Sequence, residues 1–245
     1  MLADRRYTHS NWSNSEYLPP GVKWLLIVNV ALFIPFELSS VIRQHLLLLS
    51  LAPAAVIEKF AVWQLATYMF LHGGVGHVLF NMLSLWMFGT PLERDWGTRR
   101  FLKYYFLCGI GAGLCDVALN AALGHWRTHT IGASGAIYGL LLAFGVMYPN
   151  QTVLFSFLFP IKAKYMVMIV GAIAFLGAFR INSGVSDIAH LGGMAFGFAF
   201  LRLRFVKWKS GYLQREFNEW RLRRARKRFQ VYLRKNRSDR DTWVN

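Results

Sequence analysis

Two residues of this chain have the side chains of a nucleophile and its base. Ser134 lies in the sequence Gly-Ala-Ser-Gly-Ala at 132–136, at the head of one apolar stretch, and His190 lies at the head of another. A serine hydroxyl is a weak nucleophile until a neighbouring base takes its proton, and an imidazole is a common base. If folding brings the two side chains together, the pair predicts hydrolysis at the edge of a membrane, by a Ser–His dyad.

Acyl transfer also needs hydrogen-bond donors for the developing oxyanion, and the chain has candidates. His77 and Asn81 are four residues apart, so they project from one face of a helix, and both side chains can donate. The backbone N–H of Ser134 is a third candidate, because the first N–H groups of a helix lack intrahelical partners. Tyr138, one turn after Ser134, is predicted to hold the His190 imidazole by stacking or a hydrogen bond.

Each of these residues also has a simpler interpretation. A serine in a membrane helix usually bonds a backbone carbonyl, and Asn81 alone could hold two helices together. A histidine within a membrane is costly and is therefore more often functional. The chemical interpretation depends on whether the helices carry all of these side chains to one depth.

Composition indicates the elements that must position them. The chain has 245 residues, of which 55% are hydrophobic and 16% charged, with a mean hydropathy of +0.31. This is too apolar for an ordinary soluble domain, and a membrane helix needs about 20 mostly apolar residues. The sequence predicts an all-α membrane protein with six membrane helices, over 22–39, 76–92, 101–123, 134–148, 165–179 and 188–205.

These helices define the predicted domain organisation. Residues 22–205 form one six-helix membrane domain, between a cytoplasmic segment over 1–21 and a basic cytoplasmic tail over 206–245. We expect no cleavable signal peptide, because the first apolar stretch lacks a small-residue cleavage site. Cys108 and Cys115 lie on one predicted helix and are expected to be packing residues without a disulfide. No metal-ligand spacing or nucleotide-binding motif is present, and no cofactor is expected.

Basic residues predict the orientation. With the N-terminus inside, the inner segments hold 24 of the 28 Lys and Arg residues. Cytoplasmic loops carry the excess of positive charge, so both termini are predicted to be cytoplasmic. The second, fourth and sixth helices then begin at the outer rim, where His77, Asn81, Ser134 and His190 share one depth.

Small residues predict which helices touch. Membrane helices approach closely where small residues recur every four positions. Gly135, Gly139 and Ala143 form such a face on the fourth helix, and Gly193 and Gly197 form one on the sixth. If the two faces meet, Ser134 and His190 come within reach. Asp187, three residues before His190, is expected in the outer loop, so we predict a dyad rather than a triad.

Three short motifs resemble the rhomboid family of intramembrane serine proteases. They are His77-Val-Leu-Phe-Asn81, the sequence at 132–136, and Ala189-His-Leu-Gly-Gly193 followed by Gly197, and the likeness spans about residues 20–205. His72 also matches a recurrent histidine of the family.

The resemblance assigns roles to these residues. It implies that Ser134 is the nucleophile and His190 the general base, that Tyr138 supports His190, and that His77 and Asn81 help to form the oxyanion hole. It further implies cleavage of transmembrane proteins in or near their membrane segments, without metal or cofactor.

The sequence departs from the family pattern in two places. Trp63-Gln64 stands where many members have Trp-Arg, and Glu93-Arg94-Asp95 lacks the common Glu-x-Arg spacing. Two other functions stay open. One is a catalytically inactive rhomboid-like protein that binds client transmembrane helices, and the other is a small transporter that uses the histidine and asparagine as a polar pathway.

The segments outside the helices carry further predictions. Residues 40–75 are expected to form short helices partly within the outer leaflet, because unpaired backbone groups are costly beside lipid. Residues 202–245 hold 15 of the 28 basic residues. The tail is expected to form a helix over about 211–235 and to lie on anionic headgroups rather than bind nucleic acid. We expect an integral membrane protein of the bacterial plasma membrane, with its site toward the outer face.

Overall fold

The fold is described from a computed structural model, which describes residues 18–155, 159–178 and 187–203. The chain divides into two compact units, Met1–Ala199 and Phe200–Asn245, and the account below concerns the first. The predicted tail over 206–245, with its helix over about 211–235, lies outside the described residues. Residues 1–17 of the predicted N-terminal segment over 1–21 also lie outside the described residues.

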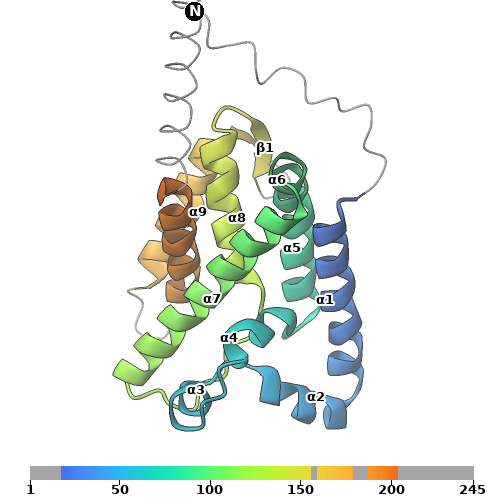
Figure 1. The fold of residues 1–245 in the computed structure, drawn as a ribbon, viewed down its shortest axis with the longest axis vertical. Helices are drawn as coiled ribbons and strands as arrows, with labels where there is room; N and C mark the ends of the chain where they lie inside the picture. The colour runs from blue at the N-terminus through green and yellow to red at the C-terminus, as the bar shows by residue number, and fades with distance from the viewer. Residues whose placement is uncertain (1–17, 156–158, 179–186, 204–245) are drawn as a thin grey trace, which may run out of the picture. The chain divides into compact units, whose positions relative to one another are not determined.

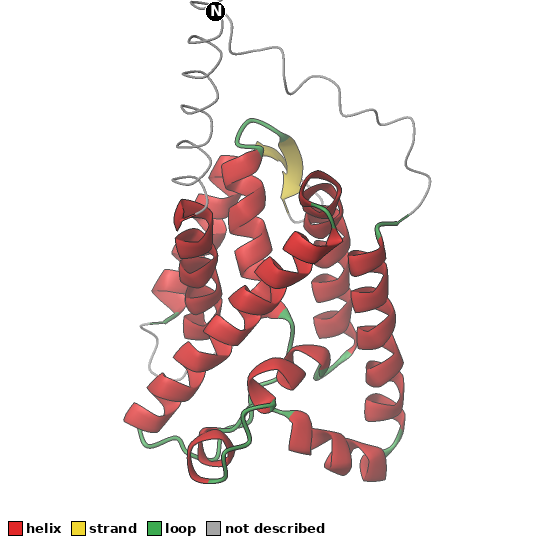
Figure 2. Ribbon diagram, in the orientation of Figure 1, coloured by secondary structure: helices red, strands yellow, loops and turns green. Residues whose placement is uncertain are grey.

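Each of the six predicted membrane segments is helical over its described residues, apart from a single residue at the end of four of them (Figures 1 and 2). The helical rods are α1 (Pro20–Leu38), a continuous rod of α5 (Val75–Ser84), η4 (Leu85–Gly89) and α6 (Thr90–Trp96), then α7 (Thr98–Ala122), α8 (Ser134–Met147), α9 (Ala163–Gly177) and a last helix over 187–203.

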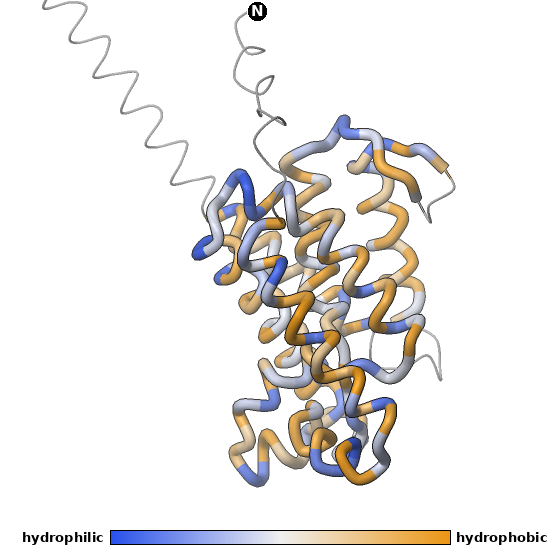
Figure 3. Tube along the Cα trace, turned by 90° about the vertical axis from the view of Figure 1, so that its right-hand side faces the viewer, coloured by the Kyte–Doolittle hydropathy of each residue, from blue (hydrophilic) through white to orange (hydrophobic). Residues whose placement is uncertain are grey.

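The rods differ in how well they suit a membrane by length and composition. Among the described residues, α1 and α7 are long and apolar enough to cross one, while α8 and α9 are apolar but shorter. Hydrophobic residues dominate the rods along most of their length (Figure 3).

The second rod changes its winding where a proline enters it. Pro91 has no N–H, and its ring crowds the carbonyl one turn earlier, so a regular α-helical turn cannot form there. The helix accommodates the proline with the wider π turn of η4, and the rod then continues as α6.

The connection from α1 to α5 consists of short helices, as predicted for residues 40–75. They are α2 (Ser40–Leu46), η2 (Leu47–Leu49), α3 (Pro53–Glu58), α4 (Gln64–Thr67) and η3 (Tyr68–Phe70). In Figure 1, α2, α3 and α4 lie at one end of the rods, and α6 and β1 lie at the other.

Gln64 and Glu93, which stand at the two departures from the family pattern, each hold neighbouring segments together by hydrogen bonds. The buried Gln64 side chain accepts a hydrogen bond from Ala52 N at 3.1 Å and donates to Leu48 O at 2.9 Å. Buried Glu93 accepts bonds of 2.7 Å from Gly21 N and from Val22 N. The glutamine therefore ties the short helices together, and the glutamate caps the start of α1.

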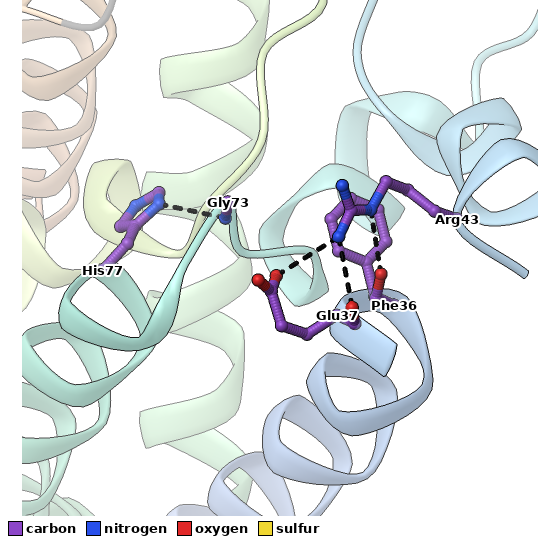
Figure 4. Close-up of polar contacts among 5 residues, drawn as sticks. All are labelled: Phe36, Glu37, Arg43, Gly73 and His77. Atoms are coloured by element: carbon purple, nitrogen blue, oxygen red, sulfur yellow. Dashed lines mark hydrogen bonds and ion pairs between the residues drawn. The ribbon is translucent and has the colours of Figure 1, made fainter. Parts of the chain in front are cut away.

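Arg43 closes the other end of α1 (Figure 4). Its guanidinium donates to Phe36 O at 3.0 Å and to Glu37 O at 3.2 Å, and it pairs with the Glu37 carboxylate at 3.5 Å. These carbonyls belong to the last turn of the helix, where intrahelical donors are missing. The arginine thus fixes the angle at which the chain leaves α1 for α2.

The connection between α8 and α9 contains a β-hairpin that the sequence does not predict. Between α8 and α9, β1 (Thr152–Phe155) pairs antiparallel with β2 (Phe159–Lys162), in the register Thr152↔Lys162. The hairpin is too short to give a clear period-two pattern, which explains why the sequence did not predict it.

The predicted small-residue contact between α8 and the last helix is confirmed. A Cβ added at Gly193 would overlap the carbonyl oxygen of Gly135, and one at Gly139 would lie 3.2 Å from Gly193 O. Gly197 instead faces the Tyr104 hydroxyl on α7. The backbones of α8 and the last helix therefore touch near the start of α8. Cys108 and Cys115 are both free, as predicted.

Candidate active site

Ser134 is the first residue of α8, as the sequence predicts. Gly132, two residues earlier, has φ of +123°, a conformation that side-chain-bearing residues rarely adopt. Its N–H donates to Tyr68 O at 2.9 Å. The glycine turn thus fixes where α8 begins and leaves the Ser134 N–H without an intrahelical partner.

The predicted nucleophile and base are in contact. His190 Nε2 lies 2.8 Å from Ser134 Oγ, although the residues are 56 positions apart in the chain. This is hydrogen-bonding distance, so Nε2 can take the hydroxyl proton directly. The glycine contact between α8 and the last helix produces this approach.

Tyr138 lies against the imidazole on the same side of α8. The two rings are stacked, with centroids 4.1 Å apart and planes inclined by 2°. Of the two modes of support that the sequence left open, stacking is the one observed. A parallel aromatic face restricts rotation of the His190 ring and keeps Nε2 directed at Ser134.

His77 presents a donor to the turn before Ser134. The Gly73 N–H donates to His77 Nδ1 at 3.4 Å, so Nδ1 is an acceptor and the ring proton is on Nε2 (Figure 4). A Cβ built at Gly132 would lie 2.7 Å from that Nε2. Glycine at 132 therefore leaves the room that the histidine N–H occupies.

Asn81 supplies a second donor with no partner. Its Nδ2 is buried and makes no hydrogen bond within the described part of the chain. It lies 3.9 Å from the Cβ position built at Gly132, so it borders the same turn. A buried donor left unpaired costs stability, and such groups in a folded protein call for a functional explanation.

His72 packs against the ring of His77. It is fully buried, its ring meets that of His77 edge-on at 5.0 Å, and neither ring nitrogen has a hydrogen-bond partner among the described residues. Burial, with a smaller contribution from His77, lowers the pKa of His72 to about 4. It is therefore neutral at pH 7 and acts as packing rather than as a base.

Asp187 is not in the outer loop, and that expectation is wrong. Asp187 is already helical in the last helix, and it lies one turn before His190 on the same face. Asp187 Oδ1 is 3.7 Å from His190 Nδ1. The three-residue spacing was the available signal, but the boundary of the helix could not be read from the sequence.

A second serine beside a histidine shows what the candidate site adds. Ser50 Oγ lies 2.7 Å from His129 Nδ1, but the same hydroxyl donates to Leu47 O. That pair links a turn to a loop. Only around Ser134, among the described residues, do a stacked ring and neighbouring donors accompany a Ser–His pair.

Comparisons with known proteins agree with this geometry. The Rhomboid domain model matches residues 59–207. The chain is 34% identical over 164 residues to RHOMBOID-like protein 1 of Arabidopsis thaliana, which is 66% of this chain and 40% of that protein. It is 33% identical to Rhomboid protease GluP of Bacillus subtilis (strain 168) over 144 residues, 59% of this chain and 26% of the relative. It is 40% identical to Putative rhomboid protease YdcA of the same strain over 140 residues, 56% of this chain and 64% of the relative.

The chain thus spans between 26% and 64% of the length of these relatives. The matched domain covers more than half of the chain and contains all three motifs of the candidate site. The chain is a member of the rhomboid family, whose members are embedded in membranes.

Proposed function

We propose that the protein is an intramembrane serine endopeptidase that hydrolyses peptide bonds in or near transmembrane segments of membrane proteins. The observation that carries the proposal is the 2.8 Å hydrogen bond between Ser134 Oγ and His190 Nε2. Two of the relatives above are named as proteases, which agrees with it. No cofactor or metal enters the proposed reaction.

In the proposed reaction, Ser134 Oγ attacks the carbonyl carbon of the scissile bond while its proton passes to His190 Nε2. Donors from His77, Asn81 and the Ser134 N–H stabilise the oxyanion. The C–N bond then breaks, His190 gives the proton to the leaving amine, and an acyl-enzyme remains. Water, deprotonated by His190, releases the second product and restores the serine.

We further propose six membrane-crossing segments with both termini in the cytoplasm. The alternate direction of the rods and the excess of basic residues in the inner segments support this arrangement. The site then faces the outer side, where a substrate helix arrives laterally and unwinds locally. The relatives include plant proteins, two of them with mitochondrial in their names, and bacterial proteins, so the bacterial plasma membrane stays a prediction.

The test compares wild type with Ser134→Ala and His190→Ala on a purified transmembrane substrate. Both variants should lose at least about 1,000-fold in kcat, because nucleophile and base act as one unit. Ser50→Ala is the matched control, since Ser50 also lies beside a histidine. Undiminished cleavage by either site variant overturns the proposed dyad.

A fluorophosphonate probe separates the enzyme from an inactive client-binding protein. The probe should label wild type and Ser50→Ala, but not Ser134→Ala. A wild-type protein that binds transmembrane helices and is never labelled would support the inactive alternative instead.

A further inference from the structure

We propose that Asp187 is a positioning residue that holds His190 in the tautomer and orientation that catalysis needs. The inference rests on the proposed function and extends it from a dyad to a three-residue chain. Asp187 does not touch the reacting atoms, so it would act only through the imidazole.

The argument begins with the protons on His190. To accept the Ser134 proton, Nε2 must be unprotonated, so the neutral ring carries its proton on Nδ1. Nδ1 is buried and has no hydrogen-bond partner in the described part of the chain. An acceptor facing Nδ1 therefore favours the reactive tautomer over the other one.

Asp187 has the right chemistry and place to be that acceptor. Its Oδ1 lies 3.7 Å from His190 Nδ1, and the exposed fractions of the two side chains are only 25% and 15%. Both residues lie on one helix, three positions apart, so their spacing is held by the backbone. The separation is slightly longer than a hydrogen bond, and such contacts commonly tighten when substrate binds.

A glycine on the neighbouring helix makes room for the carboxylate. Gly177 is the last residue of α9, and a Cβ there would overlap Asp187 Oδ2 and lie 2.7 Å from Cγ. The carboxylate is thus held between the end of α9 and the His190 ring. This niche limits the rotamers of Asp187 and keeps Oδ1 on the His190 side.

The contact matters most when the imidazole becomes charged. After Ser134 attacks, both ring nitrogens carry protons, and the carboxylate then faces a cation that is partly shielded from water. The proton on Nδ1 stays on the ring, and no bond to Asp187 forms or breaks.

The first test replaces Asp187 by Asn and by Ala in the full-length protein. Both variants should lose about 10- to 100-fold in kcat with KM unchanged, less than in a fully buried triad because the carboxylate is partly exposed. The rate of fluorophosphonate labelling of Ser134 should fall by the same factor. Asp95→Asn is the control, because Asp95 binds Tyr148 Oη at 2.5 Å and should leave these rates unchanged when substituted.

The second test displaces the carboxylate without removing it. Gly177→Ala puts a methyl group where Asp187 Oδ2 lies, so it should reproduce the loss in kcat with every charge intact. Gly171→Ala on the same helix is the matched control, since its Cβ would meet Met194 Cε at an ordinary 3.4 Å. Thermal unfolding in detergent identifies any variant that has simply lost its fold.

A spectroscopic readout separates positioning from a structural role. The His190 Nδ1–H proton resonance, assigned by its loss in His190→Ala, should be present in wild type and shifted or absent in Asp187→Asn. Wild-type kcat, labelling rate and resonance in Asp187→Asn would overturn the inference and leave the proposed function standing. A wild-type protein that neither cleaves nor is labelled would overturn the proposed function, while the resonance still tests the Asp187–His190 contact.

Discussion

Asn81 is a residue at which stability and chemistry make opposite demands. Its buried Nδ2 has no partner among the described residues, and an unsatisfied buried donor costs about 1–3 kcal/mol. The same donor borders the turn at Gly132, where a developing oxyanion would accept its hydrogen bond. An amide that gains a partner only during the reaction stabilises the transition state more than the ground state.

Asn81→Ala should therefore separate the two effects. We expect kcat to fall about 100- to 1,000-fold with little change in KM, because one oxyanion donor is lost. The thermal midpoint should stay level or rise, since the unpaired amide is gone. Steady-state cleavage and thermal unfolding of the same preparation measure both quantities.

Asn29→Ala provides the matched comparison. Asn29 is also a buried asparagine in a helix, but its Nδ2 already donates to Leu25 O at 2.7 Å. This variant should keep the wild-type kcat. Equal losses of kcat in the two variants would argue that Asn81 acts through packing.

His72 predicts a dependence of stability on pH. Burial lowers its pKa from 6.5 to about 4, so the folded protein keeps it neutral while the unfolded chain protonates it below pH 6.5. The stabilisation is fully present above pH 6.5 and falls, by on the order of 3 kcal/mol, as the pH drops from 6.5 to 4. In His72→Leu, the thermal midpoint should change less with pH between 6.5 and 4 than it does in the wild type.

The comparison for that experiment is His125→Leu, which replaces an exposed loop histidine. It should retain the wild-type slope of midpoint against pH. An unchanged slope in His72→Leu would mean that other groups cause the acid sensitivity.

At the scale of elements, the contact between α8 and the last helix determines whether the site exists. Gly193 lies so close to Gly135 O that no Cβ fits between the two backbones. Each helix carries one member of the Ser134–His190 pair, so their separation sets the 2.8 Å distance. Misplacement by about 1 Å can cost about 100-fold in rate.

Gly193→Ala should force these two helices apart. We expect the free energy of unfolding to fall by about 1–3 kcal/mol because the contact is overpacked. We expect kcat to fall by about 100-fold because Ser134 and His190 move apart. Denaturant unfolding and cleavage assays, with Gly171→Ala as the control, check the two effects. Full activity in Gly193→Ala would show that the helix contact does not set the catalytic distance.

At the scale of the whole described bundle, Glu93 joins three elements at the end opposite the site. The carboxylate of this α6 residue binds two N–H groups at the start of α1 and the Thr98 hydroxyl at the start of α7, all at 2.7 Å. Hydrogen bonds to a buried charge are stronger than neutral ones, and this charge lies at the positive end of α1.

Glu93→Ala should destabilise the protein by roughly 2–4 kcal/mol, because it removes a cap and several charge-assisted hydrogen bonds. Glu93→Gln should lose less stability than Glu93→Ala, since the amide keeps one oxygen acceptor. Thermal midpoints give the order, and Glu58→Ala, an exposed glutamate, is the control. A Glu93→Ala midpoint equal to that of the control would show that the cap adds nothing.

Much of this arrangement follows from local patterns. Long apolar stretches predict helices whatever surrounds them, because lipid requires every backbone group to be paired within the segment. Small residues at four-residue spacing predicted the α8 contact, and the apolar stretch that follows Ser134 predicted the start of α8. The hairpin at 152–162 was not predicted, and Asp187 was expected outside the last helix, since neither a short hairpin nor a helix boundary gives a strong period.

The sequence by itself determined the residue types and the helices that carry them, and it predicted a common depth for them, because hydropathy and charge are properties of segments. Only the tertiary structure decided the distances: His190 on Ser134, Tyr138 stacked on the imidazole, and Asp187 turned toward Nδ1. Those contacts join residues on different helices, or residues one turn apart whose side-chain directions depend on a neighbouring helix. They depend on which side chains leave room for which backbones, and close packing settles that only when all the helices are in place.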